Sequence, residues 1–169
     1  NATDYLNDMN SYRRAISSNQ LPLSLACYYR FNEMVEFLLS LPEIDVNKKD
    51  SNGNASIFTA LKIDDTKQST FLPLVANFLS HPQIDVNIQD SYGRTPLMVM
   101  VLSKNYAIWI TDRLKRFPKY CSIDLTIRDK QGKTAYDYLV ERHPIVAGFS
   151  EPKTITDFIN LCDILATLE

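Results

Sequence analysis

Three cysteines and two histidines are the side chains of this 169-residue chain best suited to act as nucleophile, base or metal ligand. Neither His81 nor His143 stands in a His-Glu-x-x-His pattern, and no cysteines have Cys-x-x-Cys spacing, so metal ligation has no motif. Cys121 and His143 could form a nucleophile–base pair, but their spacing does not indicate one. Cys27 and Cys162 fall on apolar helical faces and are expected in the core. We therefore expect no catalytic residue, no metal ligand, no cofactor and no enzyme activity, with both histidines near helix ends.

Carboxylates offer a second kind of chemistry. The pattern Asp-x-x-Gly occurs at 50–53, 90–93 and 129–132. Because no glycine-rich phosphate loop accompanies it, it predicts a tight turn and not a nucleotide site. Asp64 and Asp65 could bind a cation weakly, although a solvated loop is the simpler interpretation.

A basic cluster within 113–119 could contact phosphates, but a solvated outer helix face is the default interpretation. The cluster consists of Arg113, Lys115, Arg116 and Lys119. The net charge of −2 does not indicate nucleic acid or an anionic membrane as a partner. No apolar run approaches the roughly 18–20 residues that span a bilayer, and the odd, widely spaced cysteines fit a reducing compartment. We expect a cytoplasmic location, and a piece of a longer protein in which residues 1–2 are a cloning scar.

The elements that must position these residues are repeated. Segments 43–53 and 83–93 read EIDVNKKDSNG and QIDVNIQDSYG and agree at seven of eleven positions. Asp50, Asp90 and Asp129 are spaced by 40 and then 39 residues, and each precedes a glycine by three. Such self-similarity at a fixed period indicates a repeat architecture.

The sequence of each unit predicts two helices and a connecting arm. Thr95-Pro96 and Thr134-Ala135 have the residues of a helix start, with the Thr hydroxyl at the N-cap. Apolar residues follow at helical spacing, and Pro42 and Pro82 are expected to end the second helix. The alternation in Ile-Asp-Val-Asn predicts a short extended segment, and the glycine of Asp-x-x-Gly is expected at positive φ.

These units resemble the ankyrin repeat, whose signature opens with Thr-Pro-Leu-His-x-Ala. The four openings here are LPLSLACY, NASIFTAL, RTPLMVMV and KTAYDYLV. The signature Thr is replaced in the first two copies and the signature His in all four. The units exceed the usual 33 or so residues, with expected loop insertions at about 63–70 and near 116–122. The Pro-x-Ile-Asp-Val-Asn motif also resembles ankyrin arrays of protists and of secreted effectors from intracellular bacteria. The resemblance to secreted effectors would place the chain in a host cytosol.

The resemblance implies an all-α ankyrin-repeat solenoid of stacked helix-turn-helix units with short β-hairpin arms and a capping helix at each end. Residues 1–18 are the expected N-terminal capping helix, 19–143 the repeats, and 144–169 a loop and the C-terminal capping helix. The apolar stripe of that last helix comprises Ile155, Phe158, Ile159, Cys162, Leu165 and Leu168. In the core we expect Leu38, Leu79, Leu97 and Leu114.

For function, the resemblance implies a protein-binding module whose concave face is formed by arm tips and first helices. The family's variable positions predict a partner-binding set of Tyr28, Tyr29, Lys49, Asn52, Gln89, Tyr92, Arg94, Arg128, Lys130 and Lys133. We expect a monomer that binds a protein with an acidic or mixed polar surface, as a recruitment or scaffold part of a larger protein. Two alternatives remain: the non-catalytic arm of an enzyme or effector, and a weak binder of anions or nucleic acid through the basic tips.

Overall fold

The computed structural model describes residues 21–61, 68–103 and 122–166, which form helices joined by loops, with no strand among them. The first helices of the units are α2 (Pro22–Tyr28), α4 (Ser56–Leu61), α6 (Pro96–Leu102) and α8 (Ala135–Arg142). The second helices are α3 (Asn32–Ser40), α5 (Gln68–Ser80) and α9 (Ile155–Ala166), and a 3-10 helix, η4 (Pro144–Gly148), lies between α8 and α9.

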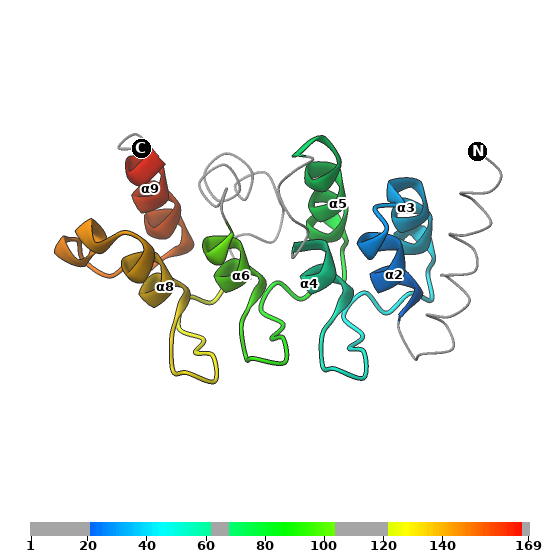
Figure 1. Cartoon of the computed structure of the whole chain (residues 1–169), viewed down its shortest axis with the longest axis horizontal. Coiled ribbons are helices and arrows are strands. Elements are labelled where there is room, and N and C mark those ends of the chain that lie inside the picture. The colour runs from blue at the N-terminus through cyan, green and yellow to red at the C-terminus, as the bar shows by residue number, and fades with distance from the viewer. Residues whose placement is uncertain (1–20, 62–67, 104–121, 167–169) are drawn as a thin grey trace.

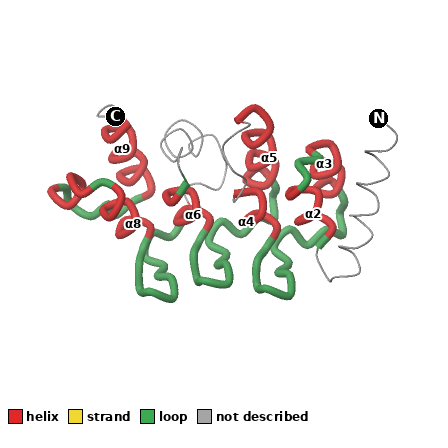
Figure 2. Tube along the Cα trace, in the orientation of Figure 1, coloured by secondary structure: helices red, strands yellow, loops and turns green. Residues whose placement is uncertain are grey.

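The first helices stand in one row and the second helices in another, and three arms project from the same side of the stack (Figure 1). The first, second and third arms are residues 41–55, 81–95 and 122–134, and each leads into the N-terminal end of a first helix. Figure 2 shows the arms as loops. In the described chain the only β pairing is an isolated antiparallel bridge between Lys49 and Ala55, so backbone turns hold the arm shape.

The predicted helix starts are confirmed. The Thr95 hydroxyl accepts the Met98 backbone N–H at 3.4 Å, and Pro96 occupies the first helical position. The Thr134 hydroxyl accepts the Asp137 N–H at 3.2 Å, and the Asp137 carboxylate accepts the Thr134 N–H at 2.7 Å. This reciprocal pair is a capping box. It leaves α8 with a better-satisfied N-terminus than α2, where Leu21 makes no side-chain cap.

Helices α3 and α5 end two residues before Pro42 and Pro82, as predicted. The prediction of an extended segment at Ile-Asp-Val-Asn is wrong, because each copy forms a turn. The Asp45 carboxylate accepts the Asn47 N–H at 3.1 Å, and its carbonyl accepts the Lys48 N–H at 3.2 Å. A short Asp side chain can bond to the backbone two residues on, and here that local bond overrides the alternating pattern.

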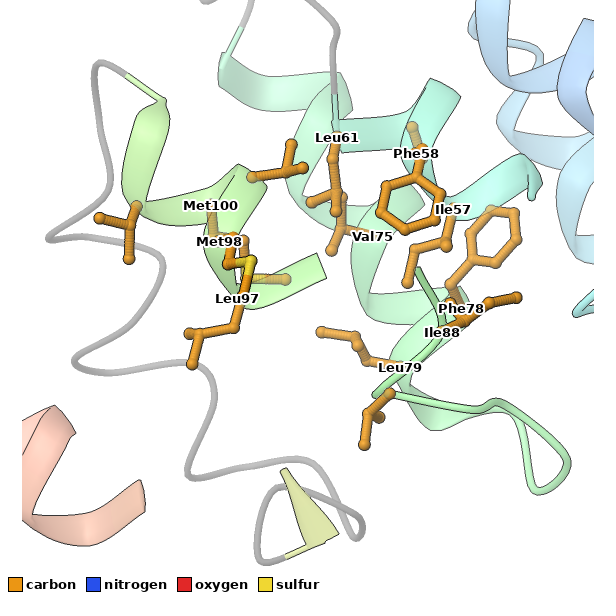
Figure 3. Packing of buried hydrophobic residues seen from close by; sticks show 14 of the residues in the cluster. Ile57, Phe58, Leu61, Val75, Phe78, Leu79, Ile88, Leu97, Met98 and Met100 are labelled. Atoms are coloured by element: carbon orange, nitrogen blue, oxygen red, sulfur yellow. The ribbon is translucent and has the colours of Figure 1, made fainter. Parts of the chain in front are cut away.

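A continuous hydrophobic core runs between the two helix rows (Figure 3). Phe58 and Phe78, from the α4–α5 unit, and Phe158, from α9, are fully buried. Leu79 and Leu97 are buried as predicted, whereas Leu38 is only partly buried and packs against the core from its edge. Leu114 lies outside the described residues. Helix α6 buries every residue from Pro96 to Val101, which is possible because neighbouring units cover it on more than one side.

Insertions and ends depart in part from the sequence prediction. Residues 68–70 belong to α5, so this part of the first insertion lengthens the second helix and is not a loop. The predicted loop after α8 contains η4, whose Val146 is fully buried and anchors it. The described part of the α9 stripe is buried as predicted. The N-terminal cap at 1–18, Leu168, residues 62–67 and most of the second insertion lie outside the described residues.

Candidate protein-binding surface

The tips of the three arms, residues 50–54, 90–94 and 129–133, share one backbone turn. In the second tip the Asp90 carboxylate accepts the Tyr92 and Arg94 N–H groups at 2.8 and 2.9 Å. The Asp90 carbonyl accepts the Gly93 N–H at 2.9 Å. Gly93 has φ +80°, and the equivalent glycines of the other tips have φ +78°. The glycines at 93 and 132 were predicted at positive φ, and that prediction is confirmed.

Asparagine side chains connect each arm to the next. Asn47 donates to the Gln83 carbonyl at 2.8 Å and accepts the Asp85 N–H at 2.9 Å. Asn87 makes the same pair of bonds to Ser122 and Asp124, at 2.7 and 2.9 Å. The third arm has Thr126 at this position, and its hydroxyl donates to the Asp124 carboxylate of its own turn. The Asn of Ile-Asp-Val-Asn is therefore a connector between units, a role the sequence analysis missed. Its signal was an Asn present in two units and changed in the last.

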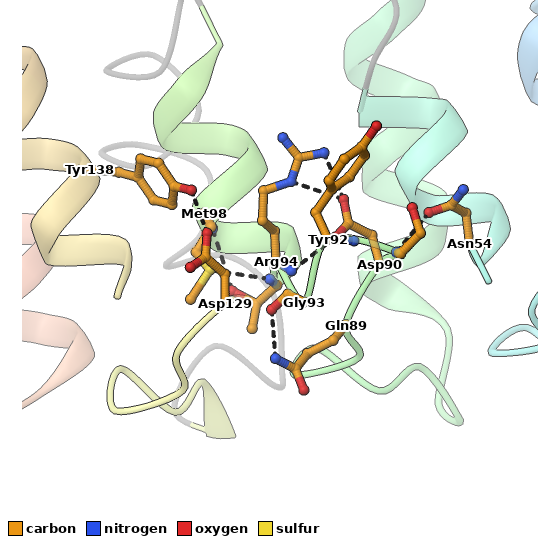
Figure 4. Close-up of polar contacts among 11 residues, drawn as sticks. Asn54, Gln89, Asp90, Tyr92, Gly93, Arg94, Met98, Asp129 and Tyr138 are labelled. Carbon is orange, nitrogen blue, oxygen red and sulfur yellow. Dashed lines mark hydrogen bonds and ion pairs between the residues drawn. The ribbon is translucent and has the colours of Figure 1, made fainter. Parts of the chain in front are cut away.

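The tips also bond to one another and form one continuous row. The Asn54 side-chain oxygen accepts the Ser91 N–H at 3.0 Å, joining the first and second tips. The Lys130 N–H donates to the Tyr92 carbonyl at 3.0 Å, joining the second and third. Gln89, one of the predicted partner-contact residues, donates to the Gly93 and Arg128 carbonyls and braces the second tip against the third arm. Figure 4 shows Gln89, Gly93 and Asp129 within this network.

The second tip holds its own ion pair. The Arg94 guanidinium donates to the Asp90 carboxylate at 2.7 and 3.0 Å, and the Asp90 side chain is fully buried. Arg94 also lies 4.7 Å above the centre of the Tyr92 ring. Burial alone would raise the pKa of Asp90, but the hydrogen bonds from Arg94 and Tyr92 outweigh it and hold that pKa below the ordinary value. Arg94 thus serves its own turn and positions Tyr92.

The third tip uses different partners for the same turn. The Asp129 carboxylate accepts the buried hydroxyl of Tyr138 from α8. Burial raises the pKa of Tyr138 to about 12, with the hydrogen bond to Asp129 as the next cause. Lys133 pairs with Glu141 at 2.6 Å and lies 5.3 Å from the centre of the Tyr138 ring. The third arm is thereby tied to its own following helix.

Comparison with known proteins bears on the fold. No protein-family model and no curated protein matches the chain. The crystal structure of the ankyrin repeat protein EF0377 is similar, with a TM-score of 0.57 and 20% sequence identity over 86% of this chain. The fold is an ankyrin-repeat solenoid. The chain spans 64% of the length of that protein.

Within the ankyrin stack, the predicted partner-binding residues fall into two places. Asn52 and Lys130 are exposed on the tip row, Lys49 is exposed directly before the first tip, and Tyr92 in the second tip is 61% exposed. Tyr28, 67% exposed, and Tyr29 lie at the C-terminal end of α2, whereas the arms join the N-terminal ends of the first helices. A seven-residue helix is about 10 Å long, so the tyrosines of α2 and the tips mark opposite edges of the first-helix row.

Three of the predicted basic contact residues already face carboxylates of the chain. Arg94 pairs with Asp90, and Lys133 pairs with Glu141. Arg128 lies 3.6 Å from Asp137 and donates to the Gly132 carbonyl at 2.7 Å. Their charge is partly balanced within the stack. Among the predicted basic residues, the charge most open to a partner is therefore carried by Lys49, Lys130 and the largely exposed Arg128.

The other chemical candidates are placed as follows. Burial raises the pKa of the Cys27 thiol, and raises that of Cys162 to about 12, so both stay protonated at neutral pH. His81 follows α5 and accepts the Gln83 N–H at 3.2 Å, and His143 is the C-cap of α8. Among the described residues no group of three His, Cys, Asp or Glu side chains could hold a metal ion, and no helix is long and apolar enough to span a membrane. Cys121, Asp64, Asp65 and the basic cluster lie outside the described part of the chain.

Proposed function

We propose that the chain binds another protein through its tip row and the adjoining first helices, as a recruitment or scaffold part of a larger protein. One observation carries the proposal. The tips are joined to one another by an Asn54 side-chain bond to the Ser91 N–H and by a backbone bond from Lys130 to Tyr92, yet they hold Tyr92 exposed at the centre of the row. A pre-ordered surface loses little conformational entropy on binding, and an exposed tyrosine offers apolar area with a polar end.

The chemistry of the tips points to a mixed polar partner surface. Because Arg94 and Lys133 are paired internally, attraction of an acidic partner rests on Lys49, Lys130 and the exposed Arg128, and it acts mainly on the association rate. Tyr92 then supplies the main anchor, since aromatic side chains dominate the energetics of protein interfaces. The same surface would serve the non-catalytic arm of a multidomain enzyme or effector.

The test begins with affinity capture from cell lysate, followed by mass spectrometry and direct titration of the captured protein. Changing Tyr92 and Lys130 to Ala should weaken binding by about 2–4 kcal/mol, because an anchor is truncated, with little change in stability. The matched control changes Phe149 and Lys153 to Ala, an exposed aromatic and an exposed lysine near the C-terminal end of the stack. Equal loss in both variants would contradict the tip-row site. Preferential capture of nucleic acid with a steep salt dependence would favour the anion-binding alternative.

A further inference from the structure

The α2–α3 unit exposes an unusual amount of apolar surface. Nine large hydrophobic side chains of the described residues are strongly exposed, and four of them fall within the ten residues 28–37. On α3 itself Phe37 is 58% exposed and Met34 is 40% exposed, and Phe31 at the N-cap is 36% exposed. Contiguous apolar surface of this kind marks an interaction site more often than isolated exposed residues do.

The described part of the next second helix, residues 74–80 of α5, has no such exposed pair. With the forty-residue spacing of the repeat, Asn77 of α5 stands where α3 has Phe37, and the fully buried Leu74 stands where α3 has Met34. Asn77 donates to the Glu36 carboxylate at 3.1 Å. On α9 the strongly exposed large hydrophobic residue is Ile164. At the positions that the structure describes on all three helices, the exposed apolar pair Met34 and Phe37 is therefore particular to α3.

Carboxylates lie alongside the ridge. Residues 31, 34 and 37 follow one another at intervals of three, and Glu33 and Glu36 form a neighbouring exposed row on the same helix. Helix α3 carries no lysine or arginine, and Glu43 just beyond it is also exposed. The face is thus apolar along one line and negative along the next.

We propose that this α3 face, made of Phe31, Glu33, Met34, Glu36 and Phe37, binds a basic amphipathic helix of a partner protein. An i±3 ridge fits the groove of another helix. The apolar stripe of such a helix would cover Phe31, Met34 and Phe37, while its flanking Lys or Arg residues meet Glu33 and Glu36. An anionic lipid surface is disfavoured because both carboxylates would face like charge. The face belongs to the second-helix row and is separate from the tip row.

The probe is a fluorescein-labelled helical peptide of about 20 residues, a length at which isolated helices can form, with a Leu stripe flanked by Lys. It is titrated against the 169-residue chain by fluorescence anisotropy. Met34→Ser with Phe37→Ser should raise the Kd at least tenfold, since the apolar contact is removed. Glu33→Lys with Glu36→Lys should raise it several-fold at low salt and flatten its salt dependence. The matched control, Ile164→Ser with Glu151→Lys at the other end of the stack, should leave the Kd unchanged.

Circular dichroism melts confirm that each variant is folded before titration. Unchanged binding in the Met34→Ser, Phe37→Ser variant would overturn the proposal. So would equal binding of a peptide whose lysines are replaced by glutamates, because charge would then play no part. If sedimentation shows that the chain self-associates through this face and does not bind the peptide, the occupant is a second copy and the proposal is wrong.

Discussion

The second and third arm tips have the same turn but different surroundings. A Cβ placed on Gly93 would lie 2.9 Å from the Lys130 backbone nitrogen and 3.2 Å from the Asp129 Cα. A Cβ on Gly132 would meet nothing within 4 Å. Both glycines have nearly the same positive φ. Local conformation alone therefore requires glycine at both tips, but at Gly93 the next arm also occupies the space that a side chain would need.

The buried aspartates differ in the same way. Asp90 and Asp129 receive the same backbone N–H groups, at i+2 and i+4. Their remaining oxygens face unlike partners: the charged guanidinium of Arg94 for Asp90 and the neutral hydroxyl of Tyr138 for Asp129. The comparison shows how a repeat keeps its backbone while each copy adapts to its neighbours. An interior tip is held by its own cation and by the next arm, and the last tip by the helix that follows it.

The largest expected effect is that of Gly93→Ala. The positive φ costs about 1 kcal/mol for a residue with a Cβ, and the contact with rigid backbone adds about 2 kcal/mol. We expect the free energy of unfolding to fall by about 3 kcal/mol, measured by urea denaturation. Gly132→Ala is the matched control and should cost about 1 kcal/mol, from φ alone. Equal losses at both positions would show that inter-arm packing adds nothing at Gly93.

The sequence was informative where structure is set locally. Thr95 and Thr134 at helix starts, Pro42 and Pro82 beyond helix ends, and Gly93 in its turn each follow from the conformational preference of the residue itself. These preferences act over a few residues, so a repeated pattern reveals them. The repeat also indicated the all-helical stack, which the similarity to a known ankyrin structure confirms.

The candidate surface was less predictable because it depends on contacts between units. The family position of Arg94 predicts an outward-facing contact residue. In the structure its guanidinium forms an ion pair with Asp90, four residues earlier in the same turn. Lys133 likewise forms a salt bridge with Glu141 of the following helix. Only the alignment of adjacent arms makes Asn87 a connector. Which side chains remain open to a partner follows from these pairings, and residue type alone does not give it.

The next effect in size separates the two aspartates. In Asp90→Asn the new NH₂ group would face the guanidinium, so two donors meet and the charge pair is lost. We expect about 2 kcal/mol of destabilisation, since the carboxylate is buried while Arg94 keeps some contact with water. In Asp129→Asn the NH₂ can donate to the Tyr138 oxygen, which accepts as well as donates. That variant should lose about 1 kcal/mol or less. The order of thermal midpoints checks this, and a larger loss for Asp129→Asn would contradict it.

The last expected effect is an alkaline pH dependence at the third tip. Tyr138 has its pKa raised from 10 to about 12, by burial first and then by the bond to Asp129. The folded chain thus holds the phenol proton more tightly than the unfolded chain does. The contribution of this proton to the free energy of unfolding is fully present below about pH 10 and is lost as the pH rises through about 12. The free energy of unfolding should therefore fall over that window, as measured by urea denaturation at a series of alkaline pH values.

Tyr138→Phe isolates this contribution from the other tyrosines. The variant loses the hydrogen bond to Asp129 and is less stable at neutral pH, but it carries no phenol that must ionise. Its stability should decline less steeply than that of the unmodified chain between about pH 10 and 12. Asp90→Asn is the control, because the guanidinium of Arg94 stays protonated throughout this range and its alkaline slope should match that of the unmodified chain. Parallel slopes for Tyr138→Phe and the unmodified chain would show that the folded chain holds the phenol proton of Tyr138 no more tightly than the unfolded chain does.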